Sequence, residues 1–209
     1  MISGLEIELK YKIENDDDTI IDRLCEKYHA TGRETIHMAA QYYDTKDLDF
    51  MKRKITLRRR KENNHFVANI KSKETYEKGL YVRHEWEKEI DPTEKIDFQN
   101  WFKNTEAESF LSDVLSKDND LGVVLETIFI REKIEFSYKD SLLEAALDKG
   151  YILANGKRTV ISEIEIELLR GKKEDIKDFG KNIIEKYYGL EPENLSKYAR
   201  GLTLIYQEG

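Results

Sequence analysis

Residues Leu5–Tyr11 read Leu-Glu-Ile-Glu-Leu-Lys-Tyr, a strict alternation of apolar and charged side chains. Successive side chains of a β-strand point to opposite faces, so this alternation predicts a strand with one apolar and one charged face. The same two-residue spacing of charges recurs in Arg58 and Arg60; Lys71 and Lys73; Arg83, Glu85, Glu87 and Glu89; Arg131 and Lys133; and Glu163, Glu165 and Glu167. The chain must therefore form a sheet of several strands in which acidic and basic side chains share one face.

Eight strands are expected, over residues 4–13, 34–44, 53–61, 65–73, 79–90, 123–137, 141–149 and 158–169. Apolar residues at helical spacing predict helices to about residue 30 after capping groups at Asp16–Thr19, in two pieces over 93–118, and over 173–188 and 193–206. Short turns such as Glu62–Asn64 and Asn155–Gly156 favour antiparallel pairing, and Gly150 is also interpreted as a turn glycine.

An antiparallel sheet of eight strands can close on itself, which removes its edges. The apolar strand faces, such as Leu5, Ile7 and Leu9, can then cover the apolar faces of the helices from outside. We predict an α+β fold: a single domain over residues 1–209 built as an eight-stranded antiparallel β-barrel, a tunnel with a charged lumen and helices packed outside.

Composition narrows the possible partners. The chain has 209 residues, a net charge of −7 and 39% hydrophobic residues, which suits one domain with an ample core and disfavours nucleic-acid binding by bulk electrostatics. Cys25 is the single cysteine, so no disulfide forms within the chain. No apolar run approaches the length of about 18 residues needed to cross a membrane, and no signal peptide is recognised. We expect a cytoplasmic protein without membrane or nucleic-acid partners.

Charges inside a barrel must be paired, hydrated or bound to a ligand, because an isolated buried charge costs several kcal/mol. Arginine and lysine suit phosphoryl oxygens, whereas grouped carboxylates suit Mg²⁺ or Mn²⁺. The alternative is a solvent-facing sheet with cross-strand ion pairs, but so many charged stripes backed by apolar faces favour a lumen. The predicted inward-facing set is Glu6, Glu8, Lys10, Arg58, Arg60, Lys71, Lys73, Arg83, Glu85, Glu87, Arg131, Lys133, Glu144, Asp148, Glu163, Glu165 and Glu167.

Glu6–Lys10 matches the ExExK signature of the CYTH, or triphosphate tunnel metalloenzyme, superfamily. Further segments agree with that family in order: Tyr42–Thr45, Leu57–Arg60, Asn69–Lys71, Arg83–Glu87, Leu147–Gly150, Glu163–Leu168 and Ser196–Tyr198. The chain therefore resembles this family over nearly its whole length. Tyr43 and Asp44 are either parts of its site or ordinary residues at a strand end.

The resemblance implies a tunnel that binds triphosphate compounds together with a divalent metal. Its catalytic residues would be Glu6, Glu8, Lys10 and Arg58. The metal ligands would come from Glu6, Glu8, Glu165 and Glu167, with Glu85, Asp148 and Glu163 as further candidates. The phosphate oxygens would be bound by Lys10, Arg58, Arg60, Lys71, Arg83, Arg131 and Lys197, the last of these projecting from the C-terminal helix.

Three functions remain compatible with these residues. The first is hydrolysis of inorganic tripolyphosphate or an organic triphosphate with Mg²⁺ or Mn²⁺. The second is a class IV adenylyl cyclase, which would release cyclic AMP and pyrophosphate instead of orthophosphate. The third is a polyphosphate or nucleotide binder without turnover. The oligomeric state is open, with a homodimer as one option.

Overall fold

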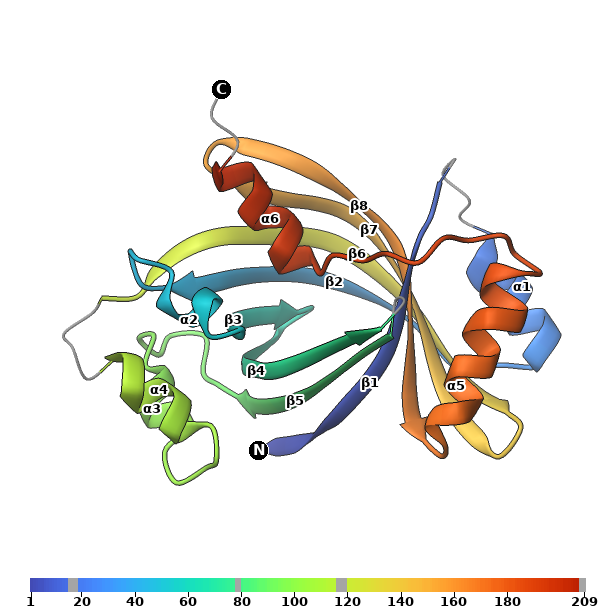
Figure 1. The fold of residues 1–209 in the computed structure, drawn as a ribbon, viewed down its shortest axis with the longest axis horizontal. Helices are drawn as coiled ribbons and strands as arrows, with labels where there is room; N and C mark the ends of the chain where they lie inside the picture. Colours follow the sequence, from blue (N-terminus) through green and yellow to red (C-terminus); the bar gives the residue numbers. More distant parts are fainter. Residues whose placement is uncertain (15–18, 78–79, 116–119, 207–209) are drawn as a thin grey trace.

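The computed structural model describes residues 1–14, 19–77, 80–115 and 120–206. Within them, eight strands close into a barrel in the order β1-β5-β4-β3-β2-β6-β7-β8, and every neighbouring pair is antiparallel (Figure 1). The strands are β1 (Ile2–Lys12), β2 (Thr31–Asp44), β3 (Ile55–Glu62), β4 (His65–Glu77), β5 (Leu80–Glu89), β6 (Gly122–Tyr138), β7 (Ser141–Ala154) and β8 (Lys157–Arg170). The predicted eight-stranded antiparallel barrel is confirmed.

The helical segments are α1 (Ile20–Tyr28), α2 (Asp49–Lys52), α3 (Phe98–Trp101), α4 (Glu108–Leu115), α5 (Lys173–Phe179), the π-helical turn η1 (Gly180–Glu185) and α6 (Lys197–Tyr206). The short α2 is absent from the sequence prediction. The predicted capping residues Asp16–Asp18 lie outside the described residues. No helix in the described ranges is long and apolar enough to span a membrane.

One glycine differs from its prediction. Gly150 lies inside β7 opposite Phe129 rather than in a turn, so β7 continues to Ala154 instead of ending near residue 149. A Cβ atom at Gly150 would overlap the backbone of Ile128 and Phe129, which explains why glycine suits this strand position. Gly156, with φ of +70°, does occupy the predicted turn.

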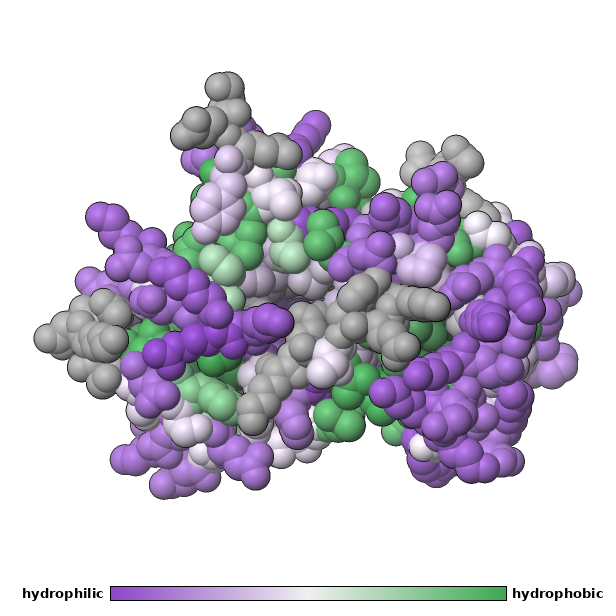
Figure 2. All heavy atoms as spheres, viewed as in Figure 1, coloured by the Kyte–Doolittle hydropathy of each residue, from purple (hydrophilic) through white to green (hydrophobic). Residues whose placement is uncertain are grey.

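Two hydrophobic clusters join helices to the outer face of the barrel. In the first, α1, α5 and η1 pack on apolar side chains of strands that include β1 and β8, such as Leu9, Tyr11 and Ile166. In the second, α3 and α4 pack on outward residues of β3, β4 and β5, such as Leu57, Ile70 and Trp86. Figure 1 shows these two groups of helices on opposite sides of the molecule, and the surface over α1 and α5 is largely hydrophilic in Figure 2.

The last helix, α6, packs differently from the others. Its Leu204 and Gly201 contact Leu125 and Ile152, which share a strand face with the lumen residues Arg131 and Asp148. The inner face is therefore apolar beneath α6 and charged elsewhere. This packing places the first turn of α6, and with it Lys197, at the edge of the charged lumen.

Candidate active site

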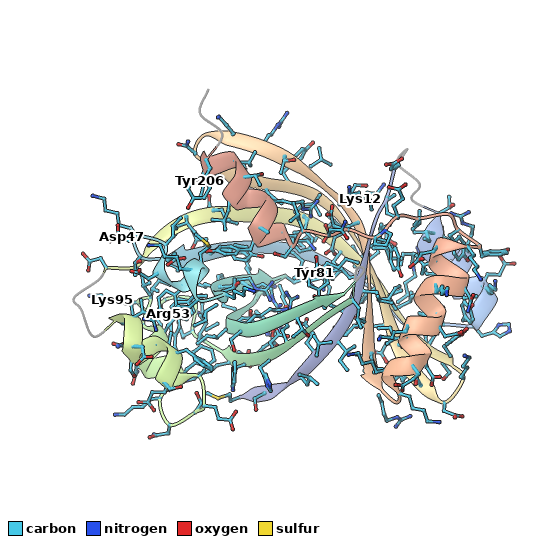
Figure 3. The ribbon with its side chains drawn as sticks, viewed as in Figure 1. Lys12, Asp47, Arg53, Tyr81, Lys95 and Tyr206 are labelled. Carbon is cyan, nitrogen blue, oxygen red and sulfur yellow. The ribbon has the colours of Figure 1, made fainter. Side chains whose placement is uncertain are left out.

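A cavity of about 740 Å³ occupies the barrel interior. Among the described residues, nine basic and eight acidic side chains line it, so the lumen is close to neutral rather than strongly positive. Figure 3 shows side chains of the surrounding strands reaching into the interior. The lining includes the predicted residues Glu6, Glu8, Lys10, Arg58, Arg60, Lys71, Arg83, Glu85, Glu87, Arg131, Lys133, Glu144, Glu165, Glu167 and Lys197. This arrangement favours the enclosed charged lumen over a solvent-facing sheet.

Two predicted residues share the inner strand face but do not border the cavity, because Lys197 lies against them, and the side chain of a third is not described. Asp148 and Glu163 are fully buried in the wall, where register pairs them across β7 and β8. The side chain of Lys73 lies outside the described set. Arg59, between Arg58 and Arg60, points outward and donates a hydrogen bond to the carbonyl of Pro92, as the two-residue period requires.

The two glutamates of β1 are paired with basic groups of neighbouring strands. Arg83 Nε lies 2.5 Å from Glu6 Oε2, Lys71 Nζ lies 2.8 Å from Glu6 Oε1, and the Arg83 guanidinium also contacts Glu8. Burial would by itself raise the pKa of Glu6, but Arg83 and Lys71 outweigh it and hold that pKa well below its usual value. The Glu6 carboxyl is therefore ionised at neutral pH.

A second cluster lies where β7 and β8 face α6. Carboxylate oxygens of Asp148, Glu163 and Glu165 lie within 4.8 Å of one another, the spacing expected of ligands to one metal ion. The Lys197 ammonium contacts all three, at 2.7 Å from Asp148 and 2.9 Å from Glu165. Burial would lower the pKa of Lys197, but these three carboxylates outweigh it and raise that pKa. The cluster thus already surrounds one positive charge.

Two further basic groups tie this cluster to the rest of the lumen. Arg131 forms a two-pronged contact with Asp148, at 2.7 Å from each oxygen, and also reaches Glu165 at 2.5 Å. Lys10 Nζ lies 2.5 Å from Glu165 and 3.1 Å from Glu8, and so connects the acids of β1 with those of β8. Closure of the barrel between β1 and β8 is what brings these groups together.

Glu167 differs from the other glutamates because its strand neighbours are also acidic. Register places it beside Glu8 on β1 and Glu144 on β7, and no described residue forms an ion pair with it. Burial, together with the charges of Glu6 and Glu8, raises the pKa of Glu167 to about 8. A surplus of carboxylate oxygen of this kind is chemically suited to a hard divalent cation, so the residues present fit the metal that the sequence implies.

The wall formed by β3, β4 and β5 carries four basic residues, Arg58, Arg60, Lys71 and Arg83, beside three acidic ones, Glu62, Glu85 and Glu87. The Nε and Nη2 groups of Arg58 are buried without a hydrogen-bond partner among the described residues, and Glu85 forms a long ion pair with Nη2 at 3.8 Å. Such N–H groups are suited to an anion's oxygens. Arg60 is paired with Glu87 at 2.8 Å. Glu85 contacts Asn69, and it lies 3.1 Å from Lys71. It therefore belongs to the wall of β3, β4 and β5 and is separate from the acidic cluster of β7 and β8.

Sequence reasoning missed two residues of the site. Arg200 contacts Glu163 from the same face of α6 as Lys197, and the i, i+3 spacing of these two residues was the available signal. Tyr42 lines the lumen beside Arg58; burial would raise its pKa, but Arg58 and Lys197 outweigh burial and lower it. No charge pattern marks Tyr42, since an inward tyrosine on a strand resembles an ordinary core residue. The available signal was the family segment Tyr42–Thr45.

A closed antiparallel barrel whose inner face carries acidic and basic side chains in contact with one another defines a class of tunnel proteins. The CYTH domain profile matches residues 4–202, and the chain belongs to this family.

Several relatives resemble this chain. It is 28% identical over 179 residues to an inorganic triphosphatase of Haemophilus influenzae, a match that covers 83% of this chain and 48% of that protein. The chain thus spans about half the length of this curated relative. Among solved structures, a Hippeastrum protein described as a candidate adenylyl cyclase with a dominant triphosphatase activity superposes with a TM-score of 0.64 at 18% identity, covering 95% of each chain. A candidate adenylate cyclase of Bacillus halodurans gives 0.60 at 20% identity, covering 96% and 98%. These structural likenesses establish the fold.

Proposed function

We propose that this protein hydrolyses a triphosphate compound inside the barrel with the help of Mg²⁺ or Mn²⁺, and that inorganic tripolyphosphate is the first substrate to test. The observation that carries the proposal is the lumen, where basic and acidic side chains line one cavity. Arg58 lies there with Nε and Nη2 groups that have no hydrogen-bond partner among the described residues, and the carboxylates of β1 and β8 line the same cavity. The description of the Haemophilus relative supports the choice of substrate.

The proposed roles follow from the positions of the side chains. Arg58, Arg60, Lys71, Arg83 and, from the other wall, Lys10, Arg131 and Lys197 bind the phosphoryl oxygens and offset their charge as the bond to the leaving phosphate breaks. The metal is held by carboxylates drawn from Glu6, Glu8, Asp148, Glu163, Glu165 and Glu167. When bound, it supplies Lewis-acid stabilisation of phosphoryl charge. Glu85 is paired with Lys71, so we assign it to positioning that lysine and not to holding the metal.

Substrate binding requires an exchange of ion pairs in this lumen. Glu6, Glu8 and Glu165 contact the same basic groups that are proposed to bind phosphate. A triphosphate that takes these basic groups leaves buried carboxylates without partners, a costly state unless a cation arrives with the anion. We therefore expect metal and triphosphate to bind together. We also propose that residues 1–209 form a single domain and that the protein acts in the cytoplasm.

A phosphate-release screen tests the function. Purified protein is incubated with tripolyphosphate, thiamine triphosphate or ATP in the presence of Mg²⁺, Mn²⁺ or a chelator, and orthophosphate, pyrophosphate and cyclic AMP are measured. Metal-dependent orthophosphate release is the expected result. Cyclic AMP with pyrophosphate would identify a cyclase, and tight binding of all three without products would identify a binder. A Glu8→Gln variant, which removes one carboxylate of the proposed metal site, should lose this metal-dependent release. Glu26→Gln, changed at an exposed position on α1, is its control.

A further inference from the structure

The end of β2 and the start of α6 are joined by one side-chain contact at the rim of the cavity. Tyr198, the second residue of α6, donates its hydroxyl hydrogen to Oδ2 of Asp44, the last residue of β2, over 3.1 Å. Asp44 is 1% exposed. The cavity lining includes Met51 and Lys54 on the α2 side and Tyr198 and Ala199 on the α6 side, so this hydrogen bond links two sides of one opening.

Asp44 is anchored independently of α6. Its carboxylate accepts hydrogen bonds from the backbone N–H groups of Thr45 at 2.8 Å, Phe50 at 3.0 Å and Met51 at 3.0 Å. These amides belong to α2 and the turn before it, so the carboxylate caps α2 and is held rigidly. Removing the tyrosine hydroxyl leaves Asp44 with three charge-assisted hydrogen bonds, and the fold around it should survive.

Tyr198 also lies directly beside the lumen chemistry. Its ring stacks on Tyr42, with centroids 5.5 Å apart, and Tyr42 is the aromatic neighbour of Arg58. The preceding residue is Lys197, whose ammonium contacts Asp148, Glu163 and Glu165. A shift of the first turn of α6 would therefore move Lys197 out of the acidic cluster and weaken the packing beside Arg58.

The other contacts of α6 either hold its later turns or are ion pairs with carboxylates of the lumen. Gly201 and Leu204 pack against the inner wall and anchor the later turns. The short ionic contacts of Lys197 and Arg200 are with carboxylates of β7 and β8, and the further ion pair of Arg200 with Glu193 is longer, at 3.8 Å. If a metal ion takes over those carboxylates, these ionic contacts weaken, whereas the hydrogen bond from Tyr198 to Asp44 persists.

We propose that Tyr198 is a positioning residue: its hydrogen bond to Asp44 fixes the first turn of α6 against α2 and so holds the Lys197 ammonium in the lumen, where it binds the triphosphate. The role in turnover rests on the function proposed above, whereas the placement of Lys197 does not.

Lysine labelling tests the placement without any metal or substrate. The full-length wild type, Tyr198→Phe and the control Tyr187→Phe, at a tyrosine that is 67% exposed, are treated with formaldehyde and a mild reductant, and methylation of each lysine is followed by mass spectrometry. Lys197 is 7% exposed and should be protected in the wild type and the control, but it should react at least severalfold faster in Tyr198→Phe. The exposed Lys52 should react equally in all three proteins.

An Asp44→Asn variant and the double variant Asp44→Asn/Tyr198→Phe give a second test. It asks whether the effects of the two changes on Lys197 labelling add. Asp44→Asn should also expose Lys197 and should melt at a lower temperature because it weakens the α2 cap. The double variant should expose Lys197 no more than Asp44→Asn alone does, since the contact that Tyr198→Phe removes is already broken in Asp44→Asn. Additive exposure would overturn the proposal.

Kinetics then tests the consequence for turnover. Tyr198→Phe should raise KM for tripolyphosphate about tenfold, equivalent to about 1.4 kcal/mol, with kcat changed less than twofold. A Lys197 that stays protected with an unchanged KM would overturn the positioning role even if triphosphatase activity is confirmed. Conversely, a wild type without hydrolytic activity would refute the proposed function, and the labelling result would still decide whether Tyr198 positions Lys197.

Discussion

The raised pKa of Glu167 makes a quantitative prediction about stability. Its carboxyl has a pKa of about 8 in the folded protein against 4.5 for an ordinary glutamate, because of burial and the nearby Glu6 and Glu8. The folded state therefore holds a proton that the unfolded state has released between these two pH values. Stability from this group is fully present below pH 4.5 and falls as the pH rises toward 8, the reverse of the usual acid effect.

The size of the effect follows from the two pKa values. At pH 8 the penalty on the free energy of unfolding is about 4 kcal/mol, and at pH 5 it is about 1 kcal/mol, since each unit of pKa shift corresponds to about 1.4 kcal/mol. Glu167→Gln removes the titrating group. The variant should therefore gain about 3 kcal/mol relative to wild type between pH 5 and pH 8, or roughly 6–12 °C in Tm for a chain of this size.

The assay is thermal unfolding of both proteins from pH 5 to pH 8.5 in the presence of a chelator, followed by circular dichroism. The exposed Glu26→Gln on α1 is the matched control and should run parallel to wild type. Adding Mg²⁺ at pH 8 should stabilise the wild type more than Glu167→Gln, because the cation offsets the acidic surplus. Parallel Tm curves for wild type and Glu167→Gln across this range would refute the assigned electrostatic environment of Glu167.

Three further predictions follow from the ion pairs of the lumen. Glu8→Gln should abolish metal-dependent turnover while circular dichroism shows an intact fold; normal activity would remove Glu8 from the metal site. Lys197→Met should lower the free energy of unfolding by about 3–5 kcal/mol in denaturant titrations, because it leaves buried Asp148, Glu163 and Glu165 short of one positive charge. In calorimetry on the wild type with a non-hydrolysable triphosphate analogue, Mg²⁺ should tighten binding of the analogue at least about tenfold, or about 1.4 kcal/mol. Equal affinities with and without Mg²⁺ would contradict the ion-pair exchange.

The fold could be predicted from sequence because it depends on local periodicity. Alternation in Leu5–Tyr11 and Glu163–Leu168 defines which side chains share a strand face whatever the strand later pairs with. Turns such as Glu62–Asn64 then leave few arrangements for consecutive strands. The two local errors have local causes. Gly150 resembles a turn glycine until its close neighbour Phe129 is known, and α2 is too short to show a helical period.

The candidate site was likewise predictable only where it depends on local sequence pattern. By itself, the sequence determined that glutamates, lysines and arginines share the inner face, because a period of two is a property of each strand. Only the tertiary structure decided which charge meets which: Lys10 contacts Glu165, 155 positions away, because β1 closes the barrel against β8. Likewise, Glu167 lies among acids while Glu165 lies among bases, and Tyr198 reaches Asp44 across the rim. Coulomb interactions depend on distance through space, and register, closure and the seating of α6 set those distances.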